Sequence, residues 1–500
     1  MILKRSIIGV ALAGSIGALG QGGFIVHFDD LQDGRSGRSV SVREVPSGFL
    51  VFCSQFSQQF PTKSHIYVRR IDPQGVHEGE HEFIVGLDRG FDIGYIDAVA
   101  SNASGLVTAV VDEGRDFASR KRLYRFDQFG DTLETRLIMT FPVEDSISQA
   151  IRQVRPVSIG YAFCGFYDLP QQRSKAMLGV MDPMGDTLWV KRYGTPIEAP
   201  VALGVAEYTD GGFLLTGYGT PPGNFNMSFL IRTDASGNEI WRRNYGNNAS
   251  VGGAVRIAAD GGIITWSEYR DPTWPNWYWQ QMMLTKWNAT GNVVWQKRSH
   301  YNNYVNTYDF EILPDGSMIA TGTALLEAVL AKFSPTGDSL WSRSFTPTHG
   351  GSYLYDVQPT SDGGFVATGE TFKYDPIDTQ FQTNQIIWVV KTDSLGCVVP
   401  GCQNVGVHEY ALDLNEHLSV WPNPVNDRIN LTFTPPPEFT ATGKLRVVLL
   451  DATGKQVLEA SFAPSTEQFN LSAVGLAPGV YHLHLSDAKK WLAGRTIVKE

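Results

Sequence analysis

The stretch DGGFLLTG at residues 210–217, with DASGNEIW at residues 234–241, contains the two turn motifs that decide the fold. Each motif places a short turn rich in Asp and Gly before an apolar run, as in a β-hairpin, where Gly supplies a positive φ angle. Around these turns the sequence predicts four strands, VALGVAEYT, FLLTGYG, MSFLIRTD and NEIWRRNYG. The unit is therefore predicted to be one four-stranded antiparallel sheet.

Both motifs recur along the chain. The first has seven copies, at Gly48, Gly105, Gly160, Gly212, Gly262, Ser317 and Gly364. The second also has seven, at Gly75, Gly130, Gly185, Gly237, Gly291, Gly337 and Gly396, with successive glycines 46 to 59 residues apart. Because one sheet cannot bury both of its faces alone, the repeats predict an all-β fold, a seven-bladed β-propeller over residues 21–402.

A tryptophan follows the second turn at a fixed offset of four residues in four units, at Trp189, Trp241, Trp295 and Trp341. A fixed offset is typical of packing between blades, so we do not predict a cofactor here. The repeats resemble the quinoprotein-type propeller repeat, whose TGxxxW signature is met by Thr290, Gly291 and Trp295, and also the repeats of exported bacterial propellers. The resemblance implies architecture alone, because the adjacent cysteine pair of the quinone enzymes is missing. No cofactor or metal is predicted.

The last unit lacks a convincing fourth strand, because its third strand runs into CVVPGC. A lone strand, FIVHFD at residues 24–29, precedes the first unit. We predict that this strand completes the seventh blade and so closes the ring.

Charge and the N-terminal residues bear on location. The chain has a formal net charge of −10, which argues against binding to nucleic acid or to anionic lipid by charge. Residues 1–20 carry Lys4 and Arg5 before a short apolar run, which predicts a cleaved signal peptide. No later segment is long and apolar enough to span a membrane, so the mature chain is predicted to be soluble or surface-attached.

The four cysteines of the chain have two different interpretations. Cys397 and Cys402 flank a Pro-Gly turn, which favours a small local disulfide. Cys53 and Cys164 lie in apolar strand runs and are interpreted as buried thiols.

The C-terminal part follows a polar connector at residues 403–416. Residues 417–500 predict a small Ig-like β-sandwich from Pro422-Asn423-Pro424, a hairpin turn at residues 451–455, and an alternating strand after Gly479. Such a module has two interpretations, an export signal or an ordinary adhesive sandwich.

The motifs of this part favour export. The sequence resembles the type A sorting domain of the type IX secretion system, in its PNP segment, its D-x-x-G-K hairpin, its G-x-Y strand and its terminal Ile497-Val498-Lys499. These motifs comprise Pro422, Asn423, Pro424, Asp451, Gly454, Lys455, Gly479 and Tyr481. The resemblance implies the type IX machinery as partner, passage through the periplasm to the exterior or the cell surface, and frequent removal of the domain.

The predicted ligand site lies on the propeller face with long, variable loops, at residues 54–64, 166–175, 218–226, 269–280 and 371–385. The fifth unit gathers aromatic residues there, Trp266, Tyr269, Trp274, Trp277, Tyr278 and Trp279. These rings either pack on the blade or form a platform for a sugar or peptide. We predict a non-enzymatic module that binds polysaccharide or protein.

The alternative is a carbohydrate-active enzyme, a glycoside hydrolase or lyase, that uses loop carboxylates among Asp112, Glu113, Asp116, Asp168, Asp271, Asp375 and Asp378. No catalytic residue is assigned. The sequence HEGEH at residues 77–81 matches a zinc-protease motif, but we predict a strand there. On a strand its histidines would be about 13 Å apart, too far for one zinc ion.

Overall fold

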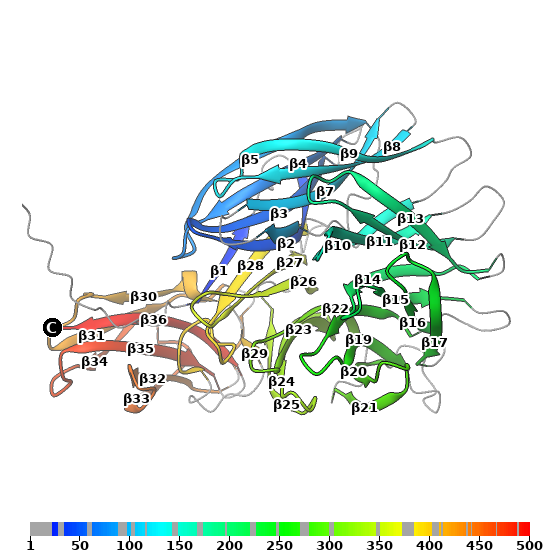
Figure 1. Cartoon of the computed structure of the whole chain (residues 1–500). Helices are drawn as coiled ribbons and strands as arrows, with labels where there is room; N and C mark the ends of the chain where they lie inside the picture. Colours follow the sequence, from blue (N-terminus) through cyan, green and yellow to red (C-terminus); the bar gives the residue numbers. More distant parts are fainter. Residues whose placement is uncertain are drawn as a thin grey trace, which may run out of the picture.

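The computed structural model describes residues 23–28, 35–57, 63–88, 98–101, 106–115, 118–142, 149–167, 174–195, 198–220, 227–246, 250–270, 280–299, 305–346, 351–372, 385–402, 410–411, 414–436, 439–441, 443–466, 468–487 and 490–500. These residues form β-strands, turns and the short 3-10 helix η3 (Asn415–His417), so the fold class is all-β (Figure 1). The predicted signal peptide lies outside the described residues.

The strands of the repeat region pair in chain order into antiparallel groups of four. The first three groups are β2 (Arg35–Val45), β3 (Gly48–Ser57), β4 (Lys63–Ile71) and β5 (His77–Asp88); β6 (Ala98–Ser101), β7 (Leu106–Arg115), β8 (Ala118–Phe126) and β9 (Thr132–Pro142); and β10 (Gln149–Val157), β11 (Gly160–Tyr167), β12 (Lys175–Met181) and β13 (Thr187–Tyr193).

The next three groups continue the pattern. They are β14 (Val201–Glu207), β15 (Phe213–Gly219), β16 (Met227–Thr233) and β17 (Glu239–Tyr245); β18 (Gly252–Ile257), β19 (Ile263–Arg270), β20 (Gln280–Trp287) and β21 (Val293–Arg298); and β22 (Val305–Ile312), β23 (Met318–Ala324), β24 (Glu327–Phe333) and β25 (Ser339–Phe345).

The last group confirms the predicted use of the N-terminal strand. It contains β26 (Ser352–Pro359), β27 (Phe365–Phe372) and β28 (Gln385–Thr392), and its fourth strand is β1 (Phe24–Phe28). Strand β1 runs antiparallel to β28, with Phe24 opposite Lys391 and Phe28 opposite Ile387. Two segments from opposite ends of the repeat region therefore share one sheet.

The first strand of each group is its inner strand. In chain order, each inner strand lies against the next, from β2 through β6, β10, β14, β18 and β22 to β26, and β26 lies against β2. Figure 1 shows β2, β10, β14, β22 and β26 near the middle of the arrangement and β5, β13, β17, β21 and β25 toward its rim. The arrangement is that of a β-propeller.

The four repeated tryptophans pack against the turn of the following sheet, which confirms the predicted packing between sheets. A Cβ atom added to the turn glycine would lie 3.0 Å or less from the indole ring in each pair, at Trp189–Gly237, Trp241–Gly291, Trp295–Gly337 and Trp341–Gly396. Phe24 of β1 takes the same place against Gly75, at 2.6 Å. A larger residue in these turns would push neighbouring sheets apart.

Buried apolar clusters fill the space between neighbouring sheets. One of them joins Phe24 and Phe28 of β1 to Val42 of β2 and Ile71 of β4. The first and last groups thus share a core, as consecutive groups do.

The C-terminal part has two sheets around one core. Its strands are β29 (Tyr410–Ala411), β30 (Leu418–Trp421), β31 (Arg428–Phe433), β32 (Leu445–Asp451), β33 (Gln456–Phe462), β34 (Gln468–Ser472), β35 (Gly479–Ser486) and β36 (Trp491–Lys499). Strands β30, β31 and β34 form one sheet, and β33, β32, β35 and β36 form the other. Ile429, Leu431, Val447 and Leu483 meet in the core between them.

Part of the predicted connector is a strand. Tyr410 and Ala411 form β29, which pairs in parallel with Ser344 and Phe345 of β25 and, through Ala411, with Trp491 of β36. The open edge of β25 offers backbone hydrogen-bonding groups that an extended segment can pair with. As a result, one continuous sheet runs from β22 into the C-terminal part.

Candidate functional site

The inner strands carry the polar side chains that face the propeller axis. A β-bulge interrupts six of the seven inner strands. One or two residues have no partner in the register on the neighbouring strand, at Val40, Arg152, Leu203, Gly253, Tyr308 with Asp309, and Tyr355. A bulge redirects side chains and is frequent beside functional sites. Here each bulge lies three to five residues before the last residue of its strand.

The two ends of the inner strands differ. In the six groups where the connection after the inner strand is described, that connection is a tight turn. The second strand of each group returns to the opposite end, where a longer connection begins in five of the seven groups. We name these the tight-turn end and the long-loop end. Arg155, Arg256 and Glu311 pair with residues near the tight turns, whereas Tyr353 pairs with Glu370 near the end of β27.

An ion-pair network lies toward the tight-turn end. Arg155 of β10 binds Glu311 at 2.7 Å and Asp309 at 3.1 Å, and Arg256 of β18 binds Asp309 at 2.6 Å and Glu311 at 2.9 Å. All four side chains are at most 17% exposed. Two other sheets separate β10 from β22 along the chain, so the Arg155–Glu311 pair crosses the axis.

A second ion pair joins the first and last groups. Arg43 of β2 binds Asp356 of β26 at 2.5 Å, and the hydroxyl of Ser41 donates to the same carboxylate at 2.8 Å. Burial by itself raises the pKa of Asp356, but Arg43 and the hydrogen bonds outweigh it and hold that pKa below its usual value. The carboxylate is therefore charged at neutral pH.

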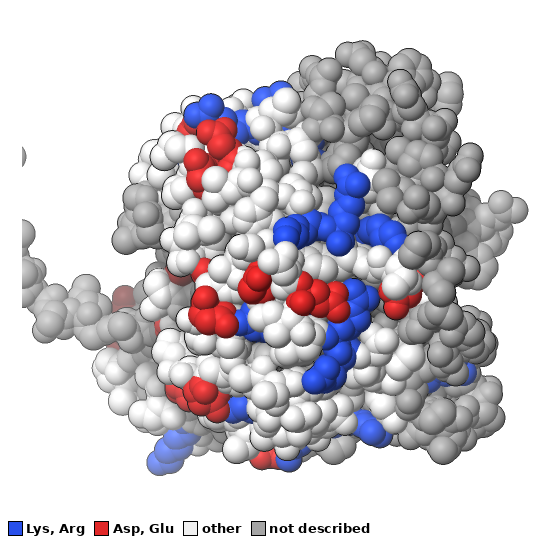
Figure 2. Space-filling model, turned by 45° about the vertical axis from the view of Figure 1, so that its right-hand side comes forward, with Lys and Arg blue, Asp and Glu red and all other residues white. Residues whose placement is uncertain are grey.

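The face of the molecule drawn in Figure 2 carries both signs of charge. Figure 2 shows Asp and Glu side chains beside Lys and Arg side chains in a band across the middle of the visible face. A mixed surface of this kind does not select a partner by its net charge.

Tyrosines and carboxyl groups lie toward the long-loop end. The rings of Tyr308 and Tyr355 meet edge to face at 4.8 Å, and Tyr353 stacks on Tyr355 at 6.2 Å. The hydroxyl of Tyr355 donates to Glu370 Oε1 at 2.5 Å. The three tyrosines are half-buried.

Glu268 of β19 lies beside the same strands. It is 5% exposed, and its Oε1 accepts a long hydrogen bond of 3.4 Å from the backbone N–H of Thr307, the neighbour of Tyr308. Burial raises the pKa of Glu268 to about 8. At neutral pH this carboxyl group is largely protonated and can act as a hydrogen-bond donor.

The aromatic residues predicted in the fifth unit fall into two groups. Trp266 is buried in the core, and its indole N–H donates to the carbonyl of Thr321 at 2.9 Å. Tyr269 is the penultimate residue of β19, with the guanidinium of Arg298 over its ring at 3.7 Å. Trp274, Trp277, Tyr278 and Trp279 lie outside the described residues.

The catalytic alternatives from the sequence are located as follows. The loop acids Asp116, Asp168, Asp271, Asp375 and Asp378 lie outside the described residues, and the side chains of Asp112 and Glu113 on β7 are not described. The HEGEH segment lies on β5, as predicted, with His77 edge to face with Phe28 at 5.1 Å. Among the described residues, no group of His, Cys, Asp or Glu could hold a metal ion.

The sorting motifs come together at one end of the C-terminal part. Asn423 Nδ2 donates to the carbonyl of Thr496 at 3.0 Å, and Asn423 Oδ1 accepts the N–H of Val498 at 2.9 Å. Gly479 lies opposite Lys499, and Tyr481 lies opposite both Ile497 and Asp451. Pro422 and Pro424 are exposed on either side of Asn423.

Two of these motif residues have clear local roles. The carboxylate of Asp451 accepts the N–H of Thr453 at 2.9 Å and of Lys455 at 3.0 Å, which fixes the turn that contains Gly454. The hydroxyl of Tyr481 donates to the carbonyl of Ala477 at 2.7 Å. We name the end formed by residues 422–424, 451–455, 479–481 and 497–499 the sorting tip.

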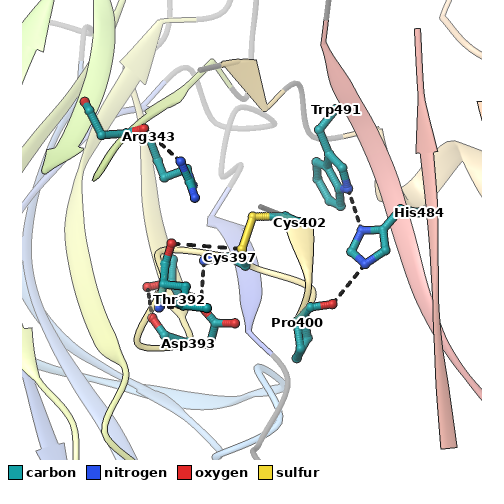
Figure 3. Close-up of a disulfide and its surroundings, with 10 residues drawn as sticks. Arg343, Thr392, Asp393, Cys397, Pro400, Cys402, His484 and Trp491 are labelled. Atoms are coloured by element: carbon teal, nitrogen blue, oxygen red, sulfur yellow. Dashed lines mark hydrogen bonds between the residues drawn. A yellow bond between two sulfur atoms is a disulfide. The ribbon is translucent and has the colours of Figure 1, made fainter. Parts of the chain in front are cut away.

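Two of the four cysteines form a disulfide, and the other two are buried thiols. Cys397 and Cys402 form a disulfide in the loop that follows β28 (Figure 3). Cys53 and Cys164 are buried in β3 and β11.

These features define an exported all-β protein with a propeller-like region and a sorting tail. Residues 419–499 match the family model described as the secretion system C-terminal sorting domain. The tail is the sorting domain of the type IX secretion system, so the protein is directed to the cell surface or the exterior. No helix in the described part of the chain is long and apolar enough to cross a membrane.

No curated protein sequence matches the chain. Similar solved structures include puromycin hydrolase, with 15% identity, a TM-score of 0.47 and coverage of 82% of this chain and 60% of that one. A second is a PL25 ulvan lyase, with 10% identity, a TM-score of 0.46 and coverage of 76% of this chain and 98% of that one. A third is hydrazine synthase of Kuenenia stuttgartiensis, with 12% identity, a TM-score of 0.41 and coverage of 72% of this chain and 96% of that one. Similarity at this level assigns neither activity nor substrate.

Proposed function

We propose that the exported protein is a seven-bladed β-propeller, residues 21–402, followed by an Ig-like sorting domain at residues 417–500 and preceded by a signal peptide at residues 1–20. The support for seven blades is the cycle of inner strands, in which β26 returns to β2. The support for the sandwich is the core shared by its two sheets.

The propeller serves as a non-enzymatic binding module for a polysaccharide or a protein, with its ligand at the long-loop end. The observation that carries this proposal is the contrast between the two ends. Arg155 and Glu311 meet across the axis near the tight turns, whereas half-buried rings of Tyr308, Tyr353 and Tyr355 lie toward the long loops. Flat aromatic rings with nearby carboxyl groups suit stacking and hydrogen bonding to sugar rings.

The fifth-unit loop joins Arg270 of β19 to Gln280 of β20 at the same end of the propeller. Tyr269, Trp274, Trp277, Tyr278 and Trp279 are proposed to add stacking surface to the inner-strand tyrosines.

A glycan array with the purified protein tests this function. Tyr308→Ala, Trp274→Ala and Trp277→Ala are each expected to weaken binding about tenfold or more, as for a contact residue at the centre of an interface. The matched control is Trp421→Ala, which removes an exposed ring of the sorting domain, 39% accessible, and should leave binding unchanged. Binding that is indifferent to all three propeller substitutions would exclude this end of the propeller.

A second candidate is a carbohydrate-active enzyme, a glycoside hydrolase or lyase. The observation in its favour is the difference between two carboxyl groups, one bonded to the N–H of Thr307 and the other to the hydroxyl of Tyr355. Glu268 has a pKa of about 8 and is suited to proton donation, while Glu370 accepts a hydrogen bond from Tyr355. Product formation from an array-positive polysaccharide, abolished by Glu268→Gln with binding retained, would favour this enzyme over the binding module.

The type IX secretion machinery is the proposed partner of the sorting tip. The support is that Pro422, Asn423 and Pro424 lie exposed beside the terminal strand, to which Asn423 is hydrogen-bonded. Asn423→Ala is expected to reduce export while the propeller still folds, and retention of the variant in the periplasm is the measurement.

A further inference from the structure

The larger sheet of the sorting domain has an apolar outer face. Along β32, Val447 and Leu449 point into the sandwich core, whereas Val448 and Leu450 belong to a separate cluster with Trp491. A sheet face directed to solvent is normally polar, so that apolar and polar residues alternate along the strand. The alternation is missing here because something covers the outer face.

The cover is the disulfide loop, residues 397–402. Val399 completes the outer cluster with Val448, Leu450 and Trp491. A Cβ atom added to Gly494 would lie 2.6 Å from a methyl group of Val399, so the loop and β36 are in close contact.

Adjacent residues of the loop pack against different parts of the protein. Val398 is buried in the propeller core with Leu354 and Trp388, while Val399 is buried against the sorting domain. Both are at most 8% exposed. The disulfide between Cys397 and Cys402 closes this loop covalently, which limits the conformations available to it.

A polar chain reinforces the contact. Figure 3 shows the ring of His484 between Trp491 and Pro400. The indole N–H of Trp491 donates to His484 Nδ1 at 3.0 Å, so His484 Nε2 carries the proton that is donated to the carbonyl of Pro400 at 2.9 Å. Burying the 1% exposed imidazole therefore leaves both of its nitrogens hydrogen-bonded.

We propose that the face formed by Val448, Leu450, His484 and Trp491 is a docking surface for residues 397–402 of the same chain. The propeller and the sorting domain then move as one rigid body. The strand β29, which bridges β25 and β36, adds backbone pairing to the same joint. The joint holds the sorting tip at the end of β36 remote from Trp491, where the chain terminus projects away from the propeller (Figure 1).

The test uses the full chain and the variant Val448→Asp, which places a charge in the docking face. The matched control is Val457→Asp on the adjacent strand β33, where the side chain is already 37% exposed. The readouts are the radius of gyration from small-angle X-ray scattering and backbone hydrogen exchange in residues 397–402. Circular dichroism and the melting of both parts report whether each remains folded.

The wild type and Val457→Asp should give the same compact scattering profile and a protected loop. Val448→Asp should increase the radius of gyration and accelerate exchange in the loop by about tenfold or more. If Val448→Asp unfolds the sorting domain, Val399→Asp makes the same change from the propeller side and leaves the sorting core intact. An unchanged profile and unchanged exchange in the folded variants would overturn the proposal, as would a wild type whose two parts move independently.

Docking of residues 397–402 on the sorting domain does not depend on the proposed function. Only its consequence, the position in which the sorting tip is held, rests on the proposed sorting role. Neither scattering nor hydrogen exchange depends on ligand binding or on export, so a failed docking test leaves the proposed function standing. Conversely, a negative glycan array would not contradict the docking of the two parts.

Discussion

The backbone N–H of Val42 donates a 2.8 Å hydrogen bond to the carboxylate of Asp356, although the two residues are 314 positions apart. The N–H of Val205 makes the equivalent bond to Gln153 Oε1 at 2.9 Å. In both cases the side chain directly after an inner-strand bulge binds the inner strand of the following sheet. The last sheet is therefore joined to the first as the third is joined to the fourth.

Substitution of Asp356 should destabilise the propeller strongly. Asp356→Ala removes the carboxylate that binds Arg43, a guanidinium only 3% exposed, and breaking such a buried pair typically costs about 3–5 kcal/mol. Urea unfolding is the measurement. The control is Asp338→Ala, whose exposed pair with Lys297 is screened by solvent and should contribute little to stability. Equal effects of the two substitutions would contradict the role given to Asp356.

Glu268 should make stability depend on pH in the opposite sense to an ordinary ion-paired carboxylate. Its pKa is raised by burial to about 8 in the folded protein, so folding favours its protonated form. That contribution is complete below the ordinary glutamate pKa and is lost as the pH rises toward 8. Glu268→Gln should therefore become increasingly stabilising, relative to the wild type, between about pH 5 and pH 8. A difference in unfolding free energy that stays constant over this range would refute the assignment.

The contact between Trp295 and Gly337 predicts a graded response to alanine. Gly337 and Gly363 have φ angles of +81° and +83°, so alanine is strained at both by about 1–2 kcal/mol. At Gly337 the new Cβ also meets Trp295 at 2.6 Å, whereas at Gly363 it has no heavy atom within 4 Å. Gly337→Ala should be less stable than Gly363→Ala by a further 1–3 kcal/mol, roughly the usual effect of overpacking. Indistinguishable denaturation midpoints would show that the tryptophans do not set the sheet spacing.

Deletion of residues 21–30 should lower the melting temperature markedly. It removes β1, bares the edge of β28 and exposes a core that contains Phe24 and Phe28, each worth about 1.5–3 kcal/mol when buried. Differential scanning calorimetry on the purified protein measures the effect. A melting curve identical to that of the parent would mean that β1 does not hold the ring together.

The sequence predicted the repeating sheets because each depends on local turn chemistry. Asp-Gly turns fix where strands reverse, and the constant offset of Trp241 from Gly237 indicated packing between sheets before any contact was known. The pairing of β1 with β28 was also predictable, because the last repeat lacked a fourth strand and the strand at residues 24–29 belonged to no repeat.

The inner-strand site was not predicted, because its residues share no local signature. The bulge positions hold residues as different as Arg152, Leu203, Gly253 and Tyr355. Arg155 and Glu311 are 156 residues apart and meet only when the sheets surround an axis. The docking of the sorting domain was missed for the same reason, since the apolar character of Val448 and Leu450 is explained by a loop that precedes them in the chain by about fifty residues.

The most direct test of the account is an experimentally determined structure of the exported protein, by crystallography or electron cryomicroscopy. We expect seven four-stranded sheets around one axis, with β1 paired to β28 and the Asp356 carboxylate on the N–H of Val42. A different number of sheets, or an open arrangement in which β26 and β2 do not meet, would contradict it.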